Sequence, residues 1–401
     1  MKKKITALCL VLAMLLALFP AVASAAVVSA EAPVKIGDVD GSGTVDSDDR
    51  TILARYLAHW PGYETINEKA ADVDENGIVD ADDRIILARY LAHWEEYSRY
   101  CLDPSEPQKV LFIGNSFIYY GKTVLEKGND KLDLSTRVND KGYFYELCKE
   151  NGLNVSVTNW TFGGHDLSSI IDEKPCKISK ARACYGECHV DYLTDKVYDV
   201  VVVSPGTNYD NFVGDLTTIK EMFTKANRKV KFICLCAASL HGCSVSGTNR
   251  PVVLNNLKTV EKMGYAIADW GGFVNGIVQG NIKVPDSKYQ YDRNSFIIRK
   301  SEDDGYHPNQ LAGYITTLMT YCVLTGSKAE GQPFAFATDA TINSNYKVST
   351  FMNKNYVAEF MGGATTNYDK ILQDADEMLQ IQKLVDAYLA DQAYLNYNFA
   401  E

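Results

Sequence analysis

Ser116, Asp304 and His307 are the side chains of this sequence that could together carry out nucleophilic catalysis. A serine hydroxyl is a poor nucleophile until a neighbouring base takes its proton. His307 is the candidate base because imidazole titrates near neutrality. Asp304, three residues earlier, could accept the other ring N–H and hold the required tautomer. The alternative for Ser116 taken alone is a helix N-cap, a common use of serine after a strand.

A second kind of chemistry is indicated by two acidic segments with regularly spaced oxygen-bearing residues. Residues 38–49 carry five acidic side chains and residues 72–83 carry six, with no basic residue in either. Calcium takes about six to eight oxygens, which in a twelve-residue loop come from positions 1, 3, 5, 7, 9 and 12 around a glycine. These positions hold Asp38, Asp40, Ser42, the Thr44 carbonyl, Asp46 and Asp49 in the first segment, and Asp72, Asp74, Asn76, the Ile78 carbonyl, Asp80 and Asp83 in the second. The pattern predicts two calcium sites, and the alternative is an acidic, solvated surface.

Each acidic loop leads into a nearly identical helical segment, so the whole unit repeats at an offset of 34 residues. Apolar side chains at helical spacing are expected to form a small core joining the two units: Ile52, Leu53, Tyr56, Leu57 and Trp60, and Ile86, Leu87, Tyr90, Leu91 and Trp94. Two loop-then-helix units with aspartate at loop position 12 resemble a type I dockerin over residues 36–95. The resemblance implies a small all-α calcium-binding dockerin with two structural ions and a cohesin domain of a scaffoldin as partner.

The chain beyond residue 108 alternates between short apolar runs and helical patterns. Strands are predicted at 109–114, 155–158, 199–204, 229–236 and 265–269, and helices at 143–150, 216–226, after Pro308 and at 370–395. Near-continuous apolar strands are typical of a parallel sheet covered on both faces, so an α/β fold is predicted. In such sheets reactive residues gather at the carboxyl ends of the strands, and Ser116 follows the first predicted strand.

Four blocks that follow these strands resemble the SGNH, or GDSL-like, hydrolase family. They read Gly114-Asn-Ser116, Gly163-Gly164, Gly206-Thr-Asn208 and Asp304-Gly-Tyr-His307-Pro-Asn309. The resemblance spans residues 109–326 and implies a three-layer α/β/α sandwich with a parallel sheet. It also implies that the Ser116 and Gly164 N–H groups and the Asn208 side-chain amide stabilise an oxyanion, with Gly163 as a competing candidate for the glycine role. No cofactor is implied for catalysis.

Two positions depart from the family pattern. Asn115 stands where the family usually has aspartate, and Tyr209 stands where an aspartate often follows the asparagine of the third block. Neither is a catalytic group. A polar insertion at 119–141 lies near the proposed nucleophile and is expected to form part of the substrate wall or a surface loop. His165 lies near the proposed oxyanion glycine, and a structural role is its default interpretation.

The N-terminal segment predicts that the protein is exported. Residues 1–25 combine three lysines, an apolar run and an Ala-Ser-Ala site, which describe a secretory signal peptide rather than a membrane anchor. The predicted parts are therefore a signal peptide at 1–25, a dockerin at 36–95, a linker at 96–108 and an SGNH-hydrolase-like catalytic domain at 109–401. A net charge of −11 argues against nucleic-acid binding. Nine of the ten cysteines lie beyond residue 25 and are expected to be mostly core thiols.

The sequence predicts a secreted, cellulosome-bound serine esterase. Its expected substrate is an acyl, and specifically an acetyl, ester on plant cell-wall polysaccharide. This choice of substrate rests on the presence of a dockerin in the same chain. A lipase or thioesterase of the same fold, and a catalytically silent carbohydrate-binding subunit, remain alternatives. The segment after residue 326 could be a lid, part of the helical layer or an aid to assembly.

Overall fold

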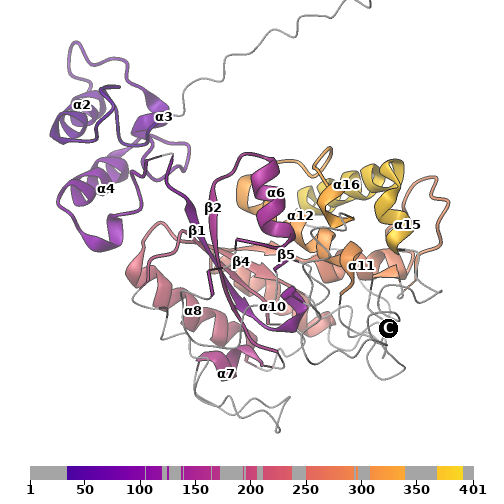
Figure 1. Ribbon diagram of the computed structural model, residues 1–401. Coiled ribbons are helices and arrows are strands. Elements are labelled where there is room, and N and C mark those ends of the chain that lie inside the picture. The colour runs from indigo at the N-terminus through magenta and orange to yellow at the C-terminus, as the bar shows by residue number, and fades with distance from the viewer. Residues whose placement is uncertain are drawn as a thin grey trace, which may run out of the picture. The chain divides into compact units, whose positions relative to one another are not determined.

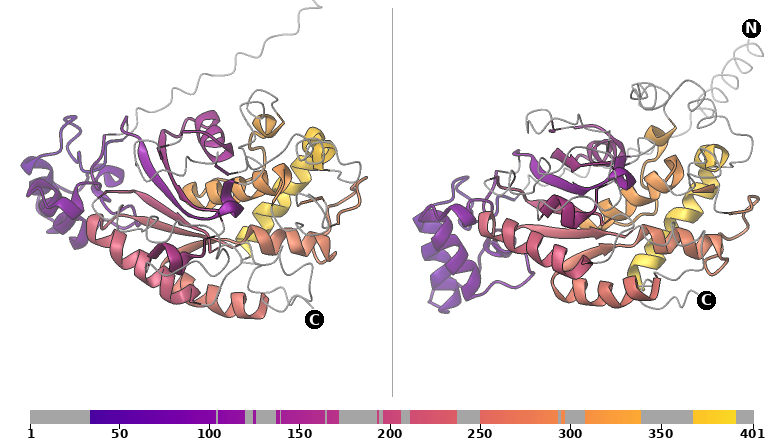
Figure 2. Two further views of the ribbon diagram at one scale, coloured as in Figure 1. Left: turned by 60° about the horizontal axis from the view of Figure 1, so that its bottom comes forward. Right: turned by 90° about the horizontal axis from the view of Figure 1, so that it is seen from below.

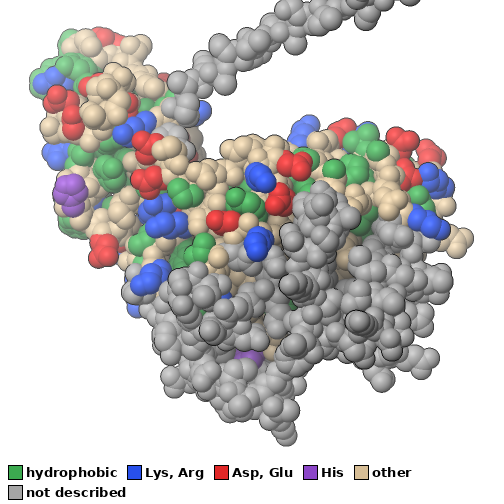
Figure 3. Space-filling view, in the orientation of Figure 1, with side chains coloured by type: hydrophobic (Ala, Val, Ile, Leu, Met, Phe, Trp, Pro, Cys, Tyr) green, Lys and Arg blue, Asp and Glu red, His purple; other side chains and the backbone are tan. Residues whose placement is uncertain are grey.

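The computed structural model describes an N-terminal helical module and a parallel α/β domain (Figure 1). The residues it describes are 34–103, 105–119, 124–125, 137–138, 140–163, 165–171, 193, 196–205, 211–236, 250–292, 295–296, 308–338 and 368–391. Among these residues no helix is both long and apolar enough to cross a membrane. On the face drawn in Figure 3, their basic and acidic side chains are interspersed.

Two helices of the N-terminal module each begin directly after an acidic loop. Helix α2 spans Ser47–Leu57 and helix α4 spans Ala81–Leu91, with the short helix α3, Glu68–Ala71, between them. Asp46 and Asp80 cap α2 and α4, and each side chain accepts a hydrogen bond from the N–H two residues further on. An aspartate at this position satisfies N–H groups that the first helical turn leaves unpaired, so the loop sequence itself starts the helix.

The small core of this module is only partly the one predicted. Leu53 and Leu87 are fully buried and pack in it. Trp60 and Trp94 were expected in the same core, but they are 58% and 49% exposed. The prediction was wrong for these two residues because α2 and α4 end at Leu57 and Leu91, so the helical spacing no longer applies three residues later.

The second part contains a five-stranded sheet in the order β2-β1-β3-β4-β5. Its strands are β1 (Gln108–Gly114), β2 (Val155–Thr161), β3 (Val200–Val203), β4 (Lys231–Leu235) and β5 (Tyr265–Ala268). All neighbouring pairs are parallel. Every residue of β3 is fully buried, as expected for a central strand covered on both faces.

Helices cover both faces of this sheet, so the predicted three-layer α/β/α sandwich is confirmed (Figures 1 and 2). One layer contains α6 (Tyr143–Glu150), α12 (Gln310–Thr325) and α16 (Ala375–Ala390). The other contains α7 (Leu167–Ile171), α8 (Phe212–Ala226) and α10 (Arg250–Lys262). Two further helices, α5 (Ser116–Tyr119) and α11 (Trp270–Val278), begin just after β1 and β5.

The helix predicted at 370–395 is two helices in the structure. Helix α15 spans Tyr368–Gln373, and α16 begins at Ala375. Asp374 separates them because its backbone is extended and its side chain accepts from the N–H of Glu377, as an N-cap does. Helix α16 packs against α12 in the helical layer. Of the alternatives for the segment after residue 326, the residues of α16 therefore form part of the helical layer.

The segment between the two parts makes ordered contacts. Tyr97, Tyr100 and Cys101 belong to the small core of the N-terminal module. Arg99 is buried and donates from Nε to Oδ1 of Asp199 (2.7 Å). Asp199 also accepts the N–H of Lys109 (2.8 Å). Because Lys109 lies at the start of β1 and Asp199 directly precedes β3, this buried arginine lies at the amino-terminal edge of the sheet.

Candidate functional site

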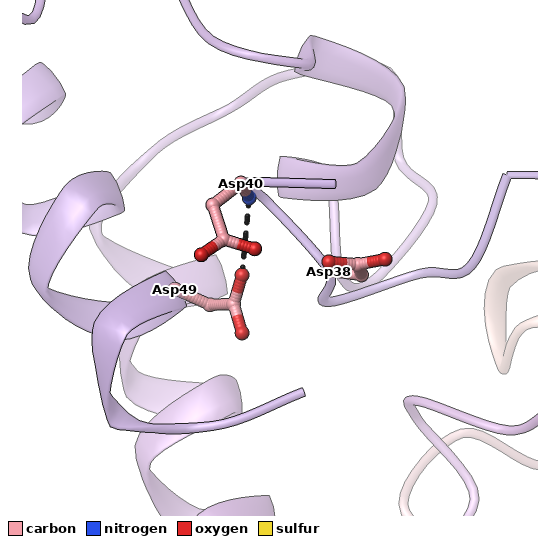
Figure 4. A group of neighbouring side chains, drawn as sticks. All are labelled: Asp38, Asp40 and Asp49. Atoms are coloured by element: carbon pink, nitrogen blue, oxygen red, sulfur yellow. Dashed lines mark hydrogen bonds between the residues drawn. The ribbon is translucent and has the colours of Figure 1, made fainter. Parts of the chain in front are cut away.

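Each acidic loop brings three carboxylates together. In the first, oxygens of Asp38, Asp40 and Asp49 lie within 4.8 Å of one another. Figure 4 shows these three side chains converging from the loop and from the first turn of α2. In the second, Asp72, Asp74 and Asp83 form the equivalent group within the same limit. Loop positions 1, 3 and 12 of the predicted calcium pattern are thus adjacent in both copies.

Backbone N–H groups of the same loop hold these carboxylates in place. The N–H of Gly43 donates to Oδ2 of Asp38, and the N–H of Gly77 donates to Oδ2 of Asp72, both at 2.9 Å. The two glycines have φ of +90° and +87°, a left-handed conformation that glycine adopts without a steric cost. Glycine at loop position 6 therefore lets the backbone turn and face the first aspartate.

The aspartate at position 12 links each loop to its helix. Asp49 Oδ1 accepts the N–H of Asp40 (3.1 Å), and its Oδ2 accepts the N–H of Asp46 (2.8 Å). Asp83 makes the equivalent contact with Asp80 (2.8 Å). Burial raises the pKa of the Asp49 and Asp83 carboxyl groups. A divalent cation beside them would favour the ionised form and offset the repulsion between the clustered carboxylates.

The donor set of the loops fits calcium. Oδ1 of Asp38 is buried and has no hydrogen-bond partner among the described residues, so one ligand-type oxygen is available inside the loop. The donors are oxygens only, which suit a hard cation rather than zinc. The remaining predicted ligands, Ser42, Thr44, Asp46, Asn76, Ile78 and Asp80, lie in the same two loops outside the three-carboxylate groups. Asp46 and Asp80 cap the helices.

Ser116 lies at the carboxyl-terminal edge of the sheet. It is half-buried and is the first residue of α5, two residues after the end of β1. The strand ends at Gly114, where an added Cβ would lie 2.8 Å from the carbonyl oxygen of Ser204 and 2.9 Å from Ile118. No side chain fits in that space. Glycine at 114 therefore allows β1 and the end of β3 to approach closely beneath Ser116.

Three strand ends are tied together around Ser116. The N–H of Phe162, directly after β2, donates to the Gly114 carbonyl (2.9 Å), and the N–H of Ser204, directly after β3, donates to the Ile113 carbonyl (2.9 Å). Asn115 donates from Nδ2 to the carbonyl of His165 (2.9 Å). The serine turn is thereby joined to the segment that contains the predicted oxyanion glycines.

Asn115 has a role that the sequence analysis did not assign. Besides its contact with His165, its Oδ1 accepts the N–H of Phe117 (3.2 Å), and the side chain is buried. It therefore fixes the first turn of α5 and the segment after β2 at once. A contact between residues so far apart in sequence has no local signal; only the departure from the family pattern marks this position.

The other predicted site residues lie outside the described residues. Gly164, Asn208, Asp304 and His307 all belong to this group. Gly163 is described, and its carbonyl lies 3.2 Å from Nδ1 of the buried His165.

The described segment that follows His307 in the sequence begins at Pro308, and hydrogen bonds of Asn309 fix its position. Asn309 is buried, caps α12 and donates from Nδ2 to the carbonyl of Ser295 (2.9 Å).

Described residues near both ends of the polar insertion contact the core of the α/β domain. Val124 and Leu125 are fully buried, and the N–H of Leu125 donates to the Ile118 carbonyl (3.3 Å) of α5. Near the other end, the carbonyl of Arg137 accepts the N–H of Asn159 (2.9 Å) in β2. Both described ends of the insertion therefore contact the elements that position Ser116 and the residues after β2.

Comparison with known proteins identifies the N-terminal module. Residues 36–92 match the family model of the dockerin type I domain. The predicted dockerin is confirmed. Both three-carboxylate groups lie within the matched residues. No curated protein matches the chain.

Solved structures resemble this chain only distantly. A protein described as a GDSL-like lipase from Parabacteroides merdae has 12% identity and a TM-score of 0.36, over 56% of this chain and 98% of its own. A family two carbohydrate esterase from Clostridium thermocellum, an active-site mutant in complex with an oligosaccharide, has 14% identity and a TM-score of 0.32, over 56% and 67%. A phospholipase A1 from Streptomyces albidoflavus has 12% identity and a TM-score of 0.30, over 54% and 99%.

Proposed function

We propose that the α/β domain is an SGNH-type serine esterase that hydrolyses acetyl esters on plant cell-wall polysaccharide. The observation that carries the proposal is the arrangement at the carboxyl-terminal edge of the sheet. There, hydrogen bonds through Gly114 and Asn115 join the Ser116 turn to the segment that follows β2, and a bond to the Ile113 carbonyl joins it to the segment that follows β3. Those segments continue into Gly164 and Asn208, the two predicted oxyanion donors.

In the proposed reaction, the hydroxyl oxygen of Ser116 attacks the ester carbonyl while its proton passes to His307. Asp304 accepts the other ring N–H and stabilises the imidazolium. The Ser116 and Gly164 N–H groups and the Asn208 amide donate to the oxyanion as it forms. The sugar hydroxyl leaves with the proton from His307. Water then attacks the acetyl-serine with His307 as base, and acetate is released.

The dockerin gives this activity its proposed location. Two calcium ions, one in each loop, would hold the three-carboxylate groups and so stabilise the module. The ions stay outside the chemistry at Ser116. With its signal peptide removed, the chain would be exported and bound to a cohesin of a scaffoldin. A polysaccharide substrate follows from that location rather than from a feature of the pocket.

Acetate release from acetylated xylan and from an aryl acetate tests the proposal. Ser116→Ala should lower turnover by roughly 10⁶-fold, as for triad serines of proteases. Ser168→Ala is the matched control, because Ser168 is also half-buried on a short helix but bonds to Asp215; its turnover should be unchanged. Equal turnover by the native chain and Ser116→Ala would reject the proposal. No release by the folded native chain would reject deacetylation of these substrates, and longer acyl esters would then separate a lipase from a silent binder.

A further inference from the structure

Arg137 is a buried arginine at the carboxyl end of β2. Only 1% of its surface is exposed. Its Nη1 donates to the carbonyl oxygens of Asn159 (3.4 Å) and Thr161 (3.3 Å) in β2. Its own carbonyl accepts the N–H of Asn159, and the next residue, Val138, forms an antiparallel bridge with Thr158. The backbone of residues 137–138 and the side chain of Arg137 therefore both bond to the last residues of β2.

The guanidinium also lies over two aromatic rings at this strand end. Its central carbon lies 4.4 Å from the ring centre of Phe162 and 5.4 Å from that of Trp160. The two rings meet edge to face at 5.3 Å. A planar guanidinium can stack on a ring face and donate in its own plane at the same time, which a lysine ammonium cannot do.

Phe162 connects this cluster to the proposed site. Its N–H donates to Gly114, directly before the Asn115-Ser116 turn, and its carbonyl accepts the N–H of His165 (3.3 Å). The rings of Phe162 and His165 also pack together, with centres 5.8 Å apart. Phe162 therefore contacts the residue before the Asn115-Ser116 turn and also His165, which directly follows the predicted oxyanion glycines in the sequence.

We propose that Arg137 is a positioning residue for the oxyanion donor that follows β2. By fixing Phe162 and the last carbonyls of the strand, it would orient the chain that leads from β2 into the predicted oxyanion glycine. This inference rests on the proposed esterase function. It assigns the end of the polar insertion a part in catalysis although Arg137 itself is buried away from substrate.

The buried Arg99 offers a matched control. It is 7% exposed and is held by Asp199, but it lies at the amino-terminal edge of the sheet. Arg137→Lys and Arg99→Lys make the same chemical change at opposite edges. Both should lower the unfolding temperature, because lysine does not reproduce the planar fork of donors that each buried guanidinium supplies. Only a change at the carboxyl-terminal edge should alter the chemical step.

The experiment measures kcat and KM for an aryl acetate, together with thermal unfolding, for the native chain, Arg137→Lys, Arg137→Met and Arg99→Lys. We expect kcat to fall about tenfold in Arg137→Lys and about 10²-fold in Arg137→Met, since small misplacements at a site have effects of this size. KM should stay within about threefold. Partial recovery by lysine relative to methionine, with Arg99→Lys retaining native kcat, supports the assignment.

Three results would overturn the assignment of Arg137 as a positioning residue or the esterase function on which it rests. Native kcat in folded Arg137→Lys and Arg137→Met would show that Arg137 is not a positioning residue. An equal fall of kcat in Arg99→Lys would show that both arginines act only through stability. No hydrolysis by the native chain would instead reject the proposed function on which the inference rests. Should Arg137→Met fail to fold, Arg137→Lys alone decides.

Discussion

The two acidic loops and the sheet edge at Ser116 both bring side chains together, but they do so over different ranges along the chain. In the first loop, all three clustered carboxylates come from twelve consecutive residues, 38–49, and N–H groups of the same loop hold them. At the sheet edge, Asn115 bonds to His165, 50 residues away. A locally encoded site carries its own geometry, whereas the sheet edge depends on the whole fold.

This difference implies that the two sites should respond independently to damage. Removing calcium should disturb the dockerin and leave the sheet edge intact. Small changes beneath Ser116 should do the reverse. Three tests, ordered by the size of the expected effect, can break or sharpen that separation.

Calcium removal should have the largest effect. A ligand at about a hundredfold excess over its dissociation constant stabilises the folded state by about 2.7 kcal/mol per site, so a chelator should lower the unfolding transition of the dockerin sharply. Calorimetry of the full chain with calcium and with chelator measures the shift. Turnover of an aryl acetate should stay within about twofold of the calcium-loaded value. An unmoved dockerin transition would mean that the paired loops hold no structural ion.

Gly114→Ala should affect the sheet edge next most strongly. The new Cβ would lie 2.8 Å from the Ser204 carbonyl, so β1 and β3 must separate, at a cost of about 1–3 kcal/mol. We expect kcat to fall about 10²-fold because the serine turn moves. Gly152→Ala is the control, since a Cβ there meets nothing within 4 Å; its kcat should be native. Native kcat in folded Gly114→Ala would contradict the close approach beneath Ser116.

Asn115→Ala should have a smaller effect. It removes the donor to the His165 carbonyl and leaves that buried oxygen less satisfied, at a cost of about 1–3 kcal/mol, and kcat should fall about tenfold. Asn227→Ala is the matched control, because Asn227 is equally buried and donates from Nδ2 to the Tyr198 carbonyl (2.8 Å). Denaturant unfolding should show similar losses for both variants. Equal kcat in the two would mean that Asn115 has only a structural role.

The fold was largely predictable because its signals are local. The apolar run before Ser116 predicted β1 within one residue, and the repeated helical pattern after each acidic loop predicted α2 and α4. The second strand continues to Thr161, beyond the predicted end at residue 158. Asn159 follows the Val-Ser-Val-Thr segment as a strongly polar residue, yet it is fully buried, and its Oδ1 accepts the N–H of Thr161 (3.1 Å). A polar residue satisfied inside a strand looks like a strand end in the sequence.

The candidate site was less predictable because many of its contacts join residues that are distant in the sequence. The carboxylates at loop positions 1, 3 and 12 follow from spacing alone, and the structure brings them together. Asn115 and Arg137 act through carbonyl oxygens of distant segments, and a backbone oxygen leaves no trace in the sequence. The assignments of Gly164, Asn208, Asp304 and His307 remain predictions from the resemblance.

The most direct test of the central claim is whether Ser116 is an activated nucleophile. A fluorophosphonate forms a serine–phosphorus bond as fluoride leaves, and it reports on the serine whatever the natural acyl group is. The chain is treated with the probe, digested and mapped by mass spectrometry. The account predicts one rapidly formed adduct, on Ser116, that is absent in Ser116→Ala and present in Ser168→Ala. An unlabelled Ser116 in the folded chain, or rapid labelling of another serine instead, would contradict it.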